Sequence, residues 1–154
     1  MQIISTRKDA HVIDIIELMV ENDALFLAQG ELVAPAFSGA NGYALGLHIF
    51  RVLRKMRYKA DKGAQRVKTP YRLLMSNSGD CKSYSVFAAA VLRSFGYACR
   101  YCFVNATGEV EPDHVFVQFE DETGATISLD ATIQDFDSLP YIVYIWELNL
   151  PAKY

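Results

Sequence analysis

The sequence is poor in cysteine and in long apolar stretches. It has 154 residues and three cysteines, an odd number, which argues against the disulfide scaffold of a small secreted domain. Charged or turn-forming residues interrupt every apolar run before it reaches membrane-spanning length. The start of the chain, Met1 to Asp9, lacks the basic segment and apolar run of a signal peptide. These absences predict a cytoplasmic location and no membrane partner.

Neither sign of charge dominates the chain as a whole. The formal net charge is -3 at pH 7, which gives no general reason to expect nucleic acid as a partner. Basic residues nevertheless gather between Arg51 and Arg72, and acidic residues gather between Glu109 and Glu122. We interpret the basic stretch as a solvated surface, and a patch for nucleic acid or an acidic partner is the alternative. The oligomeric state stays open.

The hydrophobic content, 51% of all residues, is sufficient for one domain over residues 1–154. Its first part, about residues 1–60, is predicted to be helical. Apolar residues recur there with helical spacing in two segments, Lys8 to Ala28 and Tyr43 to Tyr58. The glycines and proline between Gly30 and Gly42 indicate a loop that joins these two helices.

A core of about residues 70–146 follows, and its patterning changes along the chain. Lys82 to Phe95 is apolar on nearly all sides and ends at Gly96, as expected for a helix in the middle of a fold. After Gly96 the apolar residues recur at every second position, which predicts strands. The predicted strands are Tyr97–Val104, His114–Phe119, Ala125–Leu129 and Tyr141–Trp146. Helices followed by strands indicate an α+β domain, with an antiparallel sheet packed on the central helix.

Cys81 stands where a turn-rich segment, Ser76 to Asp80, meets this central helix. A side chain in the first helical turn lies close to unpaired backbone N–H groups and the positive end of the helix dipole. Both favour the thiolate, which is the nucleophilic form of cysteine. The position therefore makes Cys81 a candidate nucleophile, although a single cysteine is more often a small buried residue.

Acyl transfer by a thiol needs an imidazole to move the proton and a third group to orient that imidazole. His114 opens a strand in which Phe116 and Gln118 share its face. Asp130 ends the run Ile127-Ser128-Leu129-Asp130, which indicates the neighbouring strand. If these two strands form a hairpin, Asp130 lies near His114 at one end of the sheet.

Several blocks of this region resemble the core of transglutaminase-like domains. They are Gly79-Asp80-Cys81, the helix end Leu92 to Arg100, His114-Val115-Phe116-Val117 and Leu129-Asp130-Ala131-Thr132. The resemblance implies a papain-like fold with Cys81 as nucleophile, His114 as general base and acid, and Asp130 as the orienting group. The compact form also resembles transglutaminase-like proteins encoded by phages or prophages.

The chain departs from the family pattern at three positions. Lys82 stands where an acidic residue is frequent, Phe116 where Trp is frequent, and Gln118 where Glu is frequent. We expect an enzyme acting on amide bonds of a protein or peptide substrate through a thioester. Hydrolysis is favoured over cross-linking, because nothing suggests a site for a second substrate. A non-catalytic interaction module and a cross-linking transglutaminase are the alternatives. The Cys81 backbone N–H is the expected first oxyanion donor, and the second is unassigned.

Cys99 and Cys102 form a C-x-x-C pattern within a predicted strand. Residues three apart on a strand point to opposite faces, so the two thiols cannot easily meet one metal ion or each other. No second pair completes a zinc site. We therefore expect neither a metal nor a cofactor.

Overall fold

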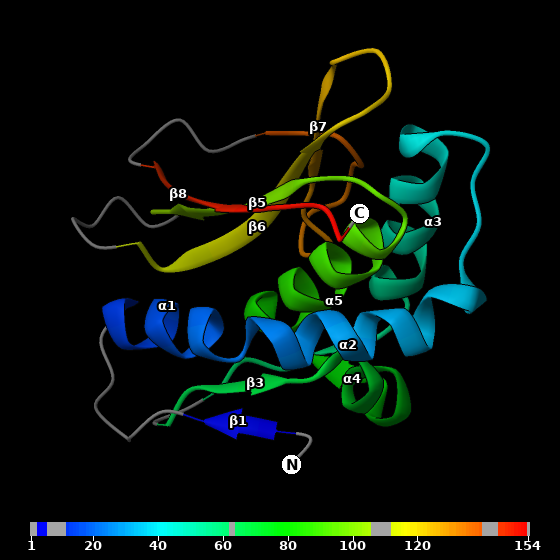
Figure 1. Cartoon of the computed structure of the whole chain (residues 1–154). Coiled ribbons are helices and arrows are strands. Elements are labelled where there is room, and N and C mark those ends of the chain that lie inside the picture. Colours follow the sequence, from blue (N-terminus) through cyan, green and yellow to red (C-terminus); the bar gives the residue numbers. More distant parts are fainter. Residues whose placement is uncertain (1–2, 6–11, 62–63, 106–111, 140–144, 154) are drawn as a thin grey trace.

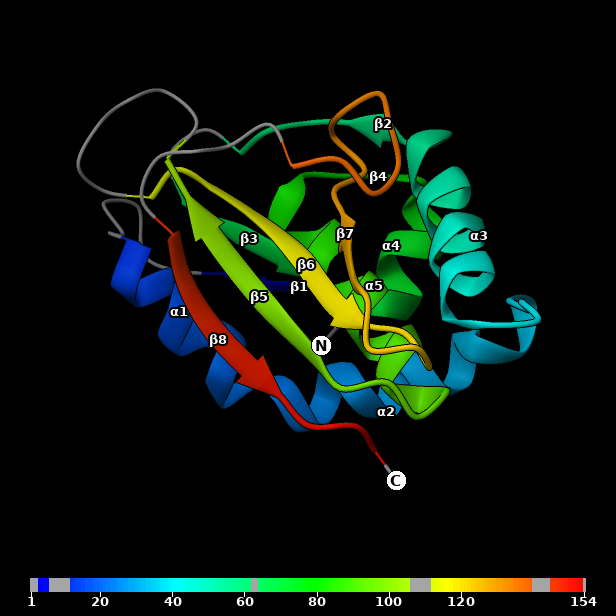
Figure 2. The ribbon, with the colours of Figure 1, turned by 90° about the horizontal axis from the view of Figure 1, so that it is seen from above.

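The computed structural model describes residues 3–5, 12–61, 64–105, 112–139 and 145–153. Most of its helices lie on one side of a four-stranded sheet, and Figures 1 and 2 show these layers from two directions. The helices are α1 (Val12–Glu21), α2 (Asp23–Val33), α3 (Gly42–Arg54), α4 (Pro70–Ser76) and α5 (Cys81–Ser94), with a 3₁₀ turn at Ala34–Ala36. The strands are β1 (Ile3–Ser5), β2 (Arg57–Tyr58), β3 (Arg66–Lys68), β4 (Ser78–Gly79), β5 (Cys99–Val104), β6 (His114–Glu120), β7 (Thr126–Leu129) and β8 (Ile145–Leu150).

The main sheet has the strand order β7-β6-β5-β8, and all its neighbouring strands are antiparallel. Val115, Val117 and Phe119 of β6 face the main core, whereas Phe116 belongs to a small cluster on the other face. The alternation predicted for this strand is therefore confirmed. Two small sheets complete the fold, β1 with β3 and β2 with β4. The arrangement confirms the predicted α+β class, with an antiparallel sheet packed on the central helix.

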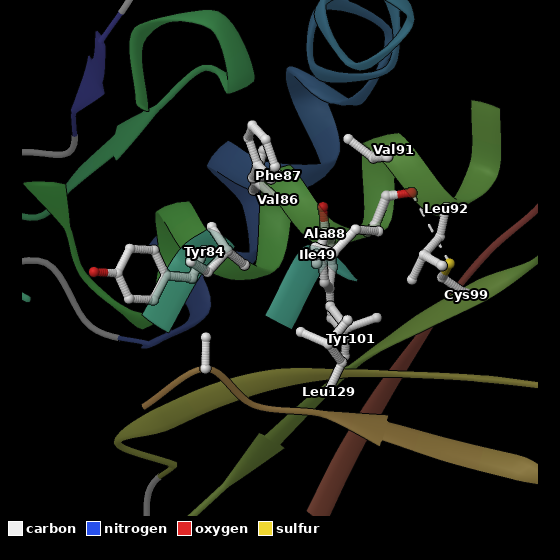
Figure 3. Packing of buried hydrophobic residues seen from close by; sticks show 14 of the residues in the cluster. Ile49, Tyr84, Val86, Phe87, Ala88, Val91, Leu92, Cys99, Tyr101 and Leu129 are labelled. Atoms are coloured by element: carbon white, nitrogen blue, oxygen red, sulfur yellow. Dashed lines mark hydrogen bonds between the residues drawn. The ribbon is translucent and has the colours of Figure 1, made fainter. Parts of the chain in front are cut away.

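Helix α5 is the centre of the molecule. Every residue from Lys82 to Arg93 is buried, because α5 is enclosed by the sheet and by the other helices (Figure 1). Phe87 points away from the sheet, while Tyr101 and Leu129 reach the helix from it (Figure 3). Gly30 of α2 allows a close crossing, since an added Cβ would lie 2.5 Å from the Cβ of Ala90. Small residues at this crossing therefore set the distance between α2 and α5.

Both ends of α5 are capped by local sequence signals. The Asp80 side chain accepts hydrogen bonds from the backbone N–H groups of Lys82 and Ser83, as an N-cap aspartate does. At the other end Gly96 has a φ of 96°. The Gly96 and Tyr97 N–H groups donate to the carbonyls of Arg93 and Leu92, which is the Schellman pattern. The C-terminal glycine predicted from the sequence is confirmed.

The prediction of one helix from Lys8 to Ala28 is wrong in its described part, and residues 8–11 lie outside the described ranges. The helix breaks at Asn22, whose side-chain amide donates to the carbonyl of Leu18. Helix α2 then continues to Val33, through the first part of the predicted loop. Burial of Phe26, Gly30 and Val33 on one side of α2 explains why the helix passes Gly30.

Two other predicted element boundaries differ from those in the structure. The helix predicted to reach Tyr58 ends at Arg54, and Arg57–Tyr58 forms a strand with Ser78–Gly79. The last strand continues to Leu150, past its predicted end at Trp146, and residues 141–144 of the predicted strand lie outside the described ranges. Pairing with distant segments decides these short strands, and local sequence patterns do not carry that information. Among the described residues, no helix has the length and apolarity to cross a bilayer.

Candidate active site

Cys81 is the first residue of α5 and is half-buried. It follows β4 and the N-cap Asp80, so the polypeptide passes directly from a strand into the helix. Gly79 lies in a crowded position, because an added Cβ would be 2.6 Å from a methyl carbon of Leu73. The glycine allows the strand to approach α4 closely, and this approach positions the thiol at the helix start.

His114 and Asp130 meet at one end of the β6–β7 hairpin. His114 is the first residue of β6, and Asp130 directly follows β7, which pairs with β6 in antiparallel register. The Nε2 atom of His114 lies 2.6 Å from Oδ2 of Asp130. Thr132 donates to Oδ1 of Asp130 from its backbone N–H, at 3.0 Å, and from its hydroxyl, at 2.6 Å. The predicted hairpin thus brings the two side chains into contact.

The thiol of Cys81 lies next to this pair, because Cys81 and His114 line the same pocket and the thiol helps to raise the pKa of His114. Since Nε2 of the imidazole is directed at Asp130, Nδ1 is the nitrogen left for the thiol. The structure therefore brings together all three candidate residues, one each from a helix start, a strand start and a strand end.

The electrostatics of His114 and Asp130 are coupled. Burial disfavours the charged imidazole, but hydrogen bonds to Asp130 and Cys81 and their negative charges outweigh it and raise the pKa of His114 to about 10. Burial also opposes ionisation of Asp130, yet the hydrogen bonds from His114 and Thr132 lower its pKa. The side-chain exposures of His114 and Asp130, 11% and 2%, leave little water to screen this pair. An imidazolium held in this way stabilises a neighbouring thiolate.

A small pocket of about 80 Å³ opens beside the thiol. Cys81 and His114 line it together with Gln65, Phe103 and Val115. A larger hollow of about 680 Å³ lies around Tyr97 and the acidic loop after β6, and none of the three candidate residues lines it. The larger hollow therefore lacks the reactive side chains. The smaller pocket contains two of them, so it is the candidate active site.

Lys82, the first departure from the family pattern, is buried, and its ammonium group lies close to three polar side chains. Its ammonium donates to the Asp80 carboxylate and to Oε1 of Gln65, the latter at 2.8 Å, and lies 3.7 Å from Oδ2 of Asp61. Burial raises the pKa of Asp80, although the charge of Lys82 acts in the opposite direction. Lys82 thus neutralises the buried carboxylate that caps the nucleophile helix.

The other two departures, Phe116 and Gln118, share the face of β6 opposite Val115, Val117 and Phe119. Figure 2 shows that no helix covers this face of the sheet. Gln118 accepts a hydrogen bond from Nε of Arg100 at 3.0 Å and donates to the Ser128 hydroxyl at 3.0 Å. Phe116 packs in a cluster with Cys102 and Val104, and its ring stacks near that of His114 with centroids 6.5 Å apart. Gln118 is therefore a cross-strand link, and Phe116 supports the imidazole from the sheet.

Sequence reasoning missed Tyr58 as a neighbour of the nucleophile. Tyr58 belongs to β2 and lies opposite Gly79 in the pairing with β4, and burial followed by the negative charges of Cys81 and Asp80 raises its pKa. No local pattern could have revealed this contact, because it depends on pairing between β2 and β4, which are distant in sequence.

The two cysteines of the C-x-x-C pair lie on opposite faces of the sheet. Cys99 belongs to the main core and Cys102 to the small cluster on the other face, which confirms the prediction that they point apart. Burial raises the pKa of each thiol to about 12. The described residues contain no group of three or more metal-ligating side chains.

The basic stretch lies on the surface of α3, β2, β3 and α4. Its exposed members are Arg51, Arg54, Lys55, Arg57, Lys59, Arg66 and Arg72. Lys68 is half-buried, and its ammonium donates to the hydroxyls of Ser76 and Ser78 and to the carbonyl of Ser78. This exposure agrees with a solvated surface, and the expectation that nucleic acid is not a partner stays a prediction.

Comparison with known proteins adds the family. The model of the Transglutaminase-like superfamily matches residues 40–131, which include Cys81, His114 and Asp130. No curated protein matches the chain.

Proposed function

Because the chain belongs to the transglutaminase-like superfamily, we propose that it is a cysteine-dependent acyl-transfer enzyme acting on amide bonds of a protein or peptide. The superfamily generally uses cysteine-based acyl transfer and also has non-catalytic members. The observation that carries the proposal is that Cys81 and His114 line one pocket while His114 contacts Asp130 at 2.6 Å. It joins a thiol, an imidazole and a buried carboxylate in the order that nucleophilic catalysis requires.

In the proposed reaction the Cys81 sulfur attacks the amide carbonyl carbon and forms a tetrahedral intermediate. The Cys81 backbone N–H donates to the oxygen that becomes negative. His114 gives its proton to the departing amine nitrogen as the C–N bond breaks, which leaves a thioester on Cys81. Asp130 holds the imidazole by its Nε2 atom and stabilises its charged form.

The thioester is then resolved by water or by an amine. His114 takes a proton from the incoming nucleophile, the new bond to the carbonyl carbon forms, and the bond to sulfur breaks. We propose hydrolysis as the main outcome. The narrow pocket of about 80 Å³ beside Cys81 supports it, because water reaches such a space more easily than the side chain of a second protein does. Three free cysteines support a reducing compartment such as the cytoplasm.

Labelling of Cys81 by iodoacetamide across pH tests the activated nucleophile. We expect rapid labelling at neutral pH in the wild-type protein and slower labelling in His114→Ala, since the imidazolium no longer stabilises the thiolate. A wild-type rate that rises only near the titration of an ordinary thiol, at about pH 8.5, would remove the basis of the proposal. In that case a non-catalytic interaction module is the better description.

Incubation with casein and a fluorescent primary amine distinguishes the outcomes of the reaction. Hydrolysis predicts released ammonia or new peptide ends, with little incorporation of the amine, and Cys81→Ala is the control. Strong Cys81-dependent incorporation would instead identify a cross-linking enzyme.

A further inference from the structure

Gln65 lies beside the nucleophile, although the two residues are distant in sequence. It directly precedes β3, is half-buried, and lines the pocket of about 80 Å³ that Cys81 and His114 also line. Strand β3 is joined to the nucleophile helix, because the Lys68 N–H donates to the Ser83 hydroxyl at 2.9 Å. Ser83 stands two residues after Cys81, so the position of Gln65 is coupled to that of the thiol.

Lys82 fixes the orientation of the Gln65 amide group. Its ammonium donates to Oε1 of Gln65 at 2.8 Å. An ammonium group has only donors, so the amide oxygen must face Lys82 and the two N–H groups on Nε2 must be directed elsewhere. The positive charge also polarises the amide, which makes these N–H groups stronger hydrogen-bond donors.

Lys82 is itself held in place at the start of α5. Its ammonium donates to the Asp80 carboxylate, and the same carboxylate accepts hydrogen bonds from the backbone N–H groups of Lys82 and Ser83. The Lys82 side chain is only 8% exposed, so its partners are protein groups rather than water. A chain of contacts therefore leads from the helix cap through Lys82 to Gln65, and it begins one residue before the thiol.

Few of the described residues that line the pocket can donate a hydrogen bond to a substrate oxygen. Apart from the thiol, the donor side chains are Gln65, Lys82 and His114, and the others are apolar or acidic. In the proposed function His114 carries the proton, and the Lys82 ammonium is used by Asp80 and by Gln65 itself. The amide of Gln65 is therefore the side-chain donor best suited to an oxyanion.

We propose that the Gln65 amide is the second oxyanion donor, together with the Cys81 backbone N–H, and that Lys82 is the positioning residue that orients it. This inference rests on the proposed function. As the sulfur–carbon bond forms, the π electron pair of the carbonyl moves onto oxygen, which accepts hydrogen bonds from both N–H groups. The pair returns when the leaving group departs. An acidic side chain at position 82 could not donate to Oε1, so the departure from the family pattern there belongs to the same arrangement.

Two reagents test Gln65 in the full chain. Attack on p-nitrophenyl acetate forms an S–C bond through an oxyanion and releases p-nitrophenolate, whereas iodoacetamide alkylates sulfur by displacing iodide and forms no oxyanion. In Gln65→Met, which keeps the side-chain length, we expect the p-nitrophenolate burst to slow about 100-fold, the effect of losing one oxyanion donor. Alkylation of Cys81 should keep its wild-type rate. Gln65→Ala should show the same loss, which excludes obstruction of the pocket by Met.

Gln29→Met is the matched control. Oε1 of Gln29 also accepts a hydrogen bond, from the Tyr71 N–H at 3.1 Å, but Gln29 does not line the pocket beside Cys81. Both rates should therefore stay at the wild-type value in this variant. Circular dichroism checks the fold of each protein.

A double-mutant cycle tests Lys82 through the ratio of the acylation rate to the alkylation rate. Lys82→Met should lower this ratio when Gln65 is present and leave it unchanged in the Gln65→Met background, where no amide remains to be oriented. Lys82→Arg keeps a cationic donor and should retain the wild-type ratio. It also carries the test if Lys82→Met does not fold, since a ratio in Lys82→Arg as low as in Gln65→Met would contradict the positioning role.

The outcomes that overturn the inference are distinct from failure of the proposed function. Equal ratios in the wild type and in both Gln65 variants show that the amide is not an oxyanion donor. A parallel fall of acylation and alkylation has the same meaning, because Gln65 would then support only the thiolate. A ratio that Lys82→Met lowers equally in both backgrounds removes the positioning role. A wild-type protein with no Cys81-dependent burst rejects the proposed function itself.

Discussion

The N-terminal end of α5 carries Cys81 and Lys82, and its C-terminal end carries Arg93 and packs against Cys99. Each end therefore has a thiol and a buried cation. Cys81 is half-buried, meets His114 and opens into a pocket. Cys99 is buried against the carbonyl of Ala89 (Figure 3), and burial raises the pKa of its thiol to about 12. Hydrogen-bonding partners and solvent access, rather than residue type, therefore decide which thiol can react.

The two cations differ in the same way. Lys82 neutralises Asp80, and the side chains of both are less than one-tenth exposed. Arg93 donates to Asp23, whose side chain is 28% exposed, and to the carbonyl of Pro151. The cation at the reactive end thus balances a charge that water cannot reach, whereas the other one ties the chain end to the helix. The following predictions test this contrast.

The largest expected effect separates the two thiols. Cys81→Ala should abolish the burst of p-nitrophenolate that the protein releases from p-nitrophenyl acetate, a loss of at least about 10³-fold, because the nucleophile is gone. Cys99→Ala should retain the burst and lose stability by about 1–2 kcal/mol, because it leaves a small cavity. Stopped-flow absorbance and urea denaturation measure the two quantities. A burst that survives Cys81→Ala would reject this contrast.

The second effect concerns the imidazole. Asp130→Asn should slow acylation by about 10²- to 10⁴-fold, because the imidazole loses the group that orients it and stabilises its charge. Asp135→Asn is the control, since Asp135 is exposed in the segment that follows β7. Similar rates in the two variants would mean that Asp130 has only a structural role.

The same pair predicts how stability depends on pH. The pKa of His114 is raised from 6.5 to about 10 in the folded chain, so its contribution is complete below pH 6.5 and is lost as the pH rises through about 10. The stability difference between wild type and Asp130→Asn should therefore shrink over this range. Urea denaturation of the two proteins at pH 6.5 and at about pH 10 measures this stability difference. A difference that grows towards pH 10 would contradict the assigned direction of the shift.

The third effect compares the cations. Lys82→Met should destabilise the protein by about 3–5 kcal/mol, because it leaves the buried Asp80 without its counter-charge. Arg93→Met should cost less, about 1–3 kcal/mol, because water can partly solvate Asp23. Urea denaturation of both variants at neutral pH measures the order, and the reverse order would show that solvent access to the acid is not decisive.

The smallest effects concern the glycines that flank α5. Gly79→Ala should destabilise by about 1–3 kcal/mol, because the added carbon overlaps Leu73, and it should also slow Cys81 alkylation. Gly96→Ala should cost about 1 kcal/mol through its positive φ alone, since no atom lies within 4 Å of the added carbon. Alkylation should stay at the wild-type rate in Gly96→Ala, and an equal loss in both variants would remove the link between Gly79 and the thiol.

Sequence patterns predicted α5 and strands β5, β6 and β7 because their signals are local. The cap at Asp80, the glycine at Gly96 and the alternation in β6 are each readable within a few residues. The break at Asn22 and the two-residue strands β2 and β4 were not predicted. Their conformations depend on packing against α5 and on pairing between distant segments.

The order and identity of the reactive residues could be predicted from the sequence. They are a thiol at a helix start, a histidine at the start of a strand and an aspartate at the end of the next strand. Period-two alternation and helix capping act over short distances, so they are legible without a structure. The tertiary structure decided that Nε2 of His114 meets Asp130, that Lys82 neutralises Asp80, and that Tyr58 lies opposite Gly79. These contacts depend on burial and on distances between segments, which only the packed chain defines.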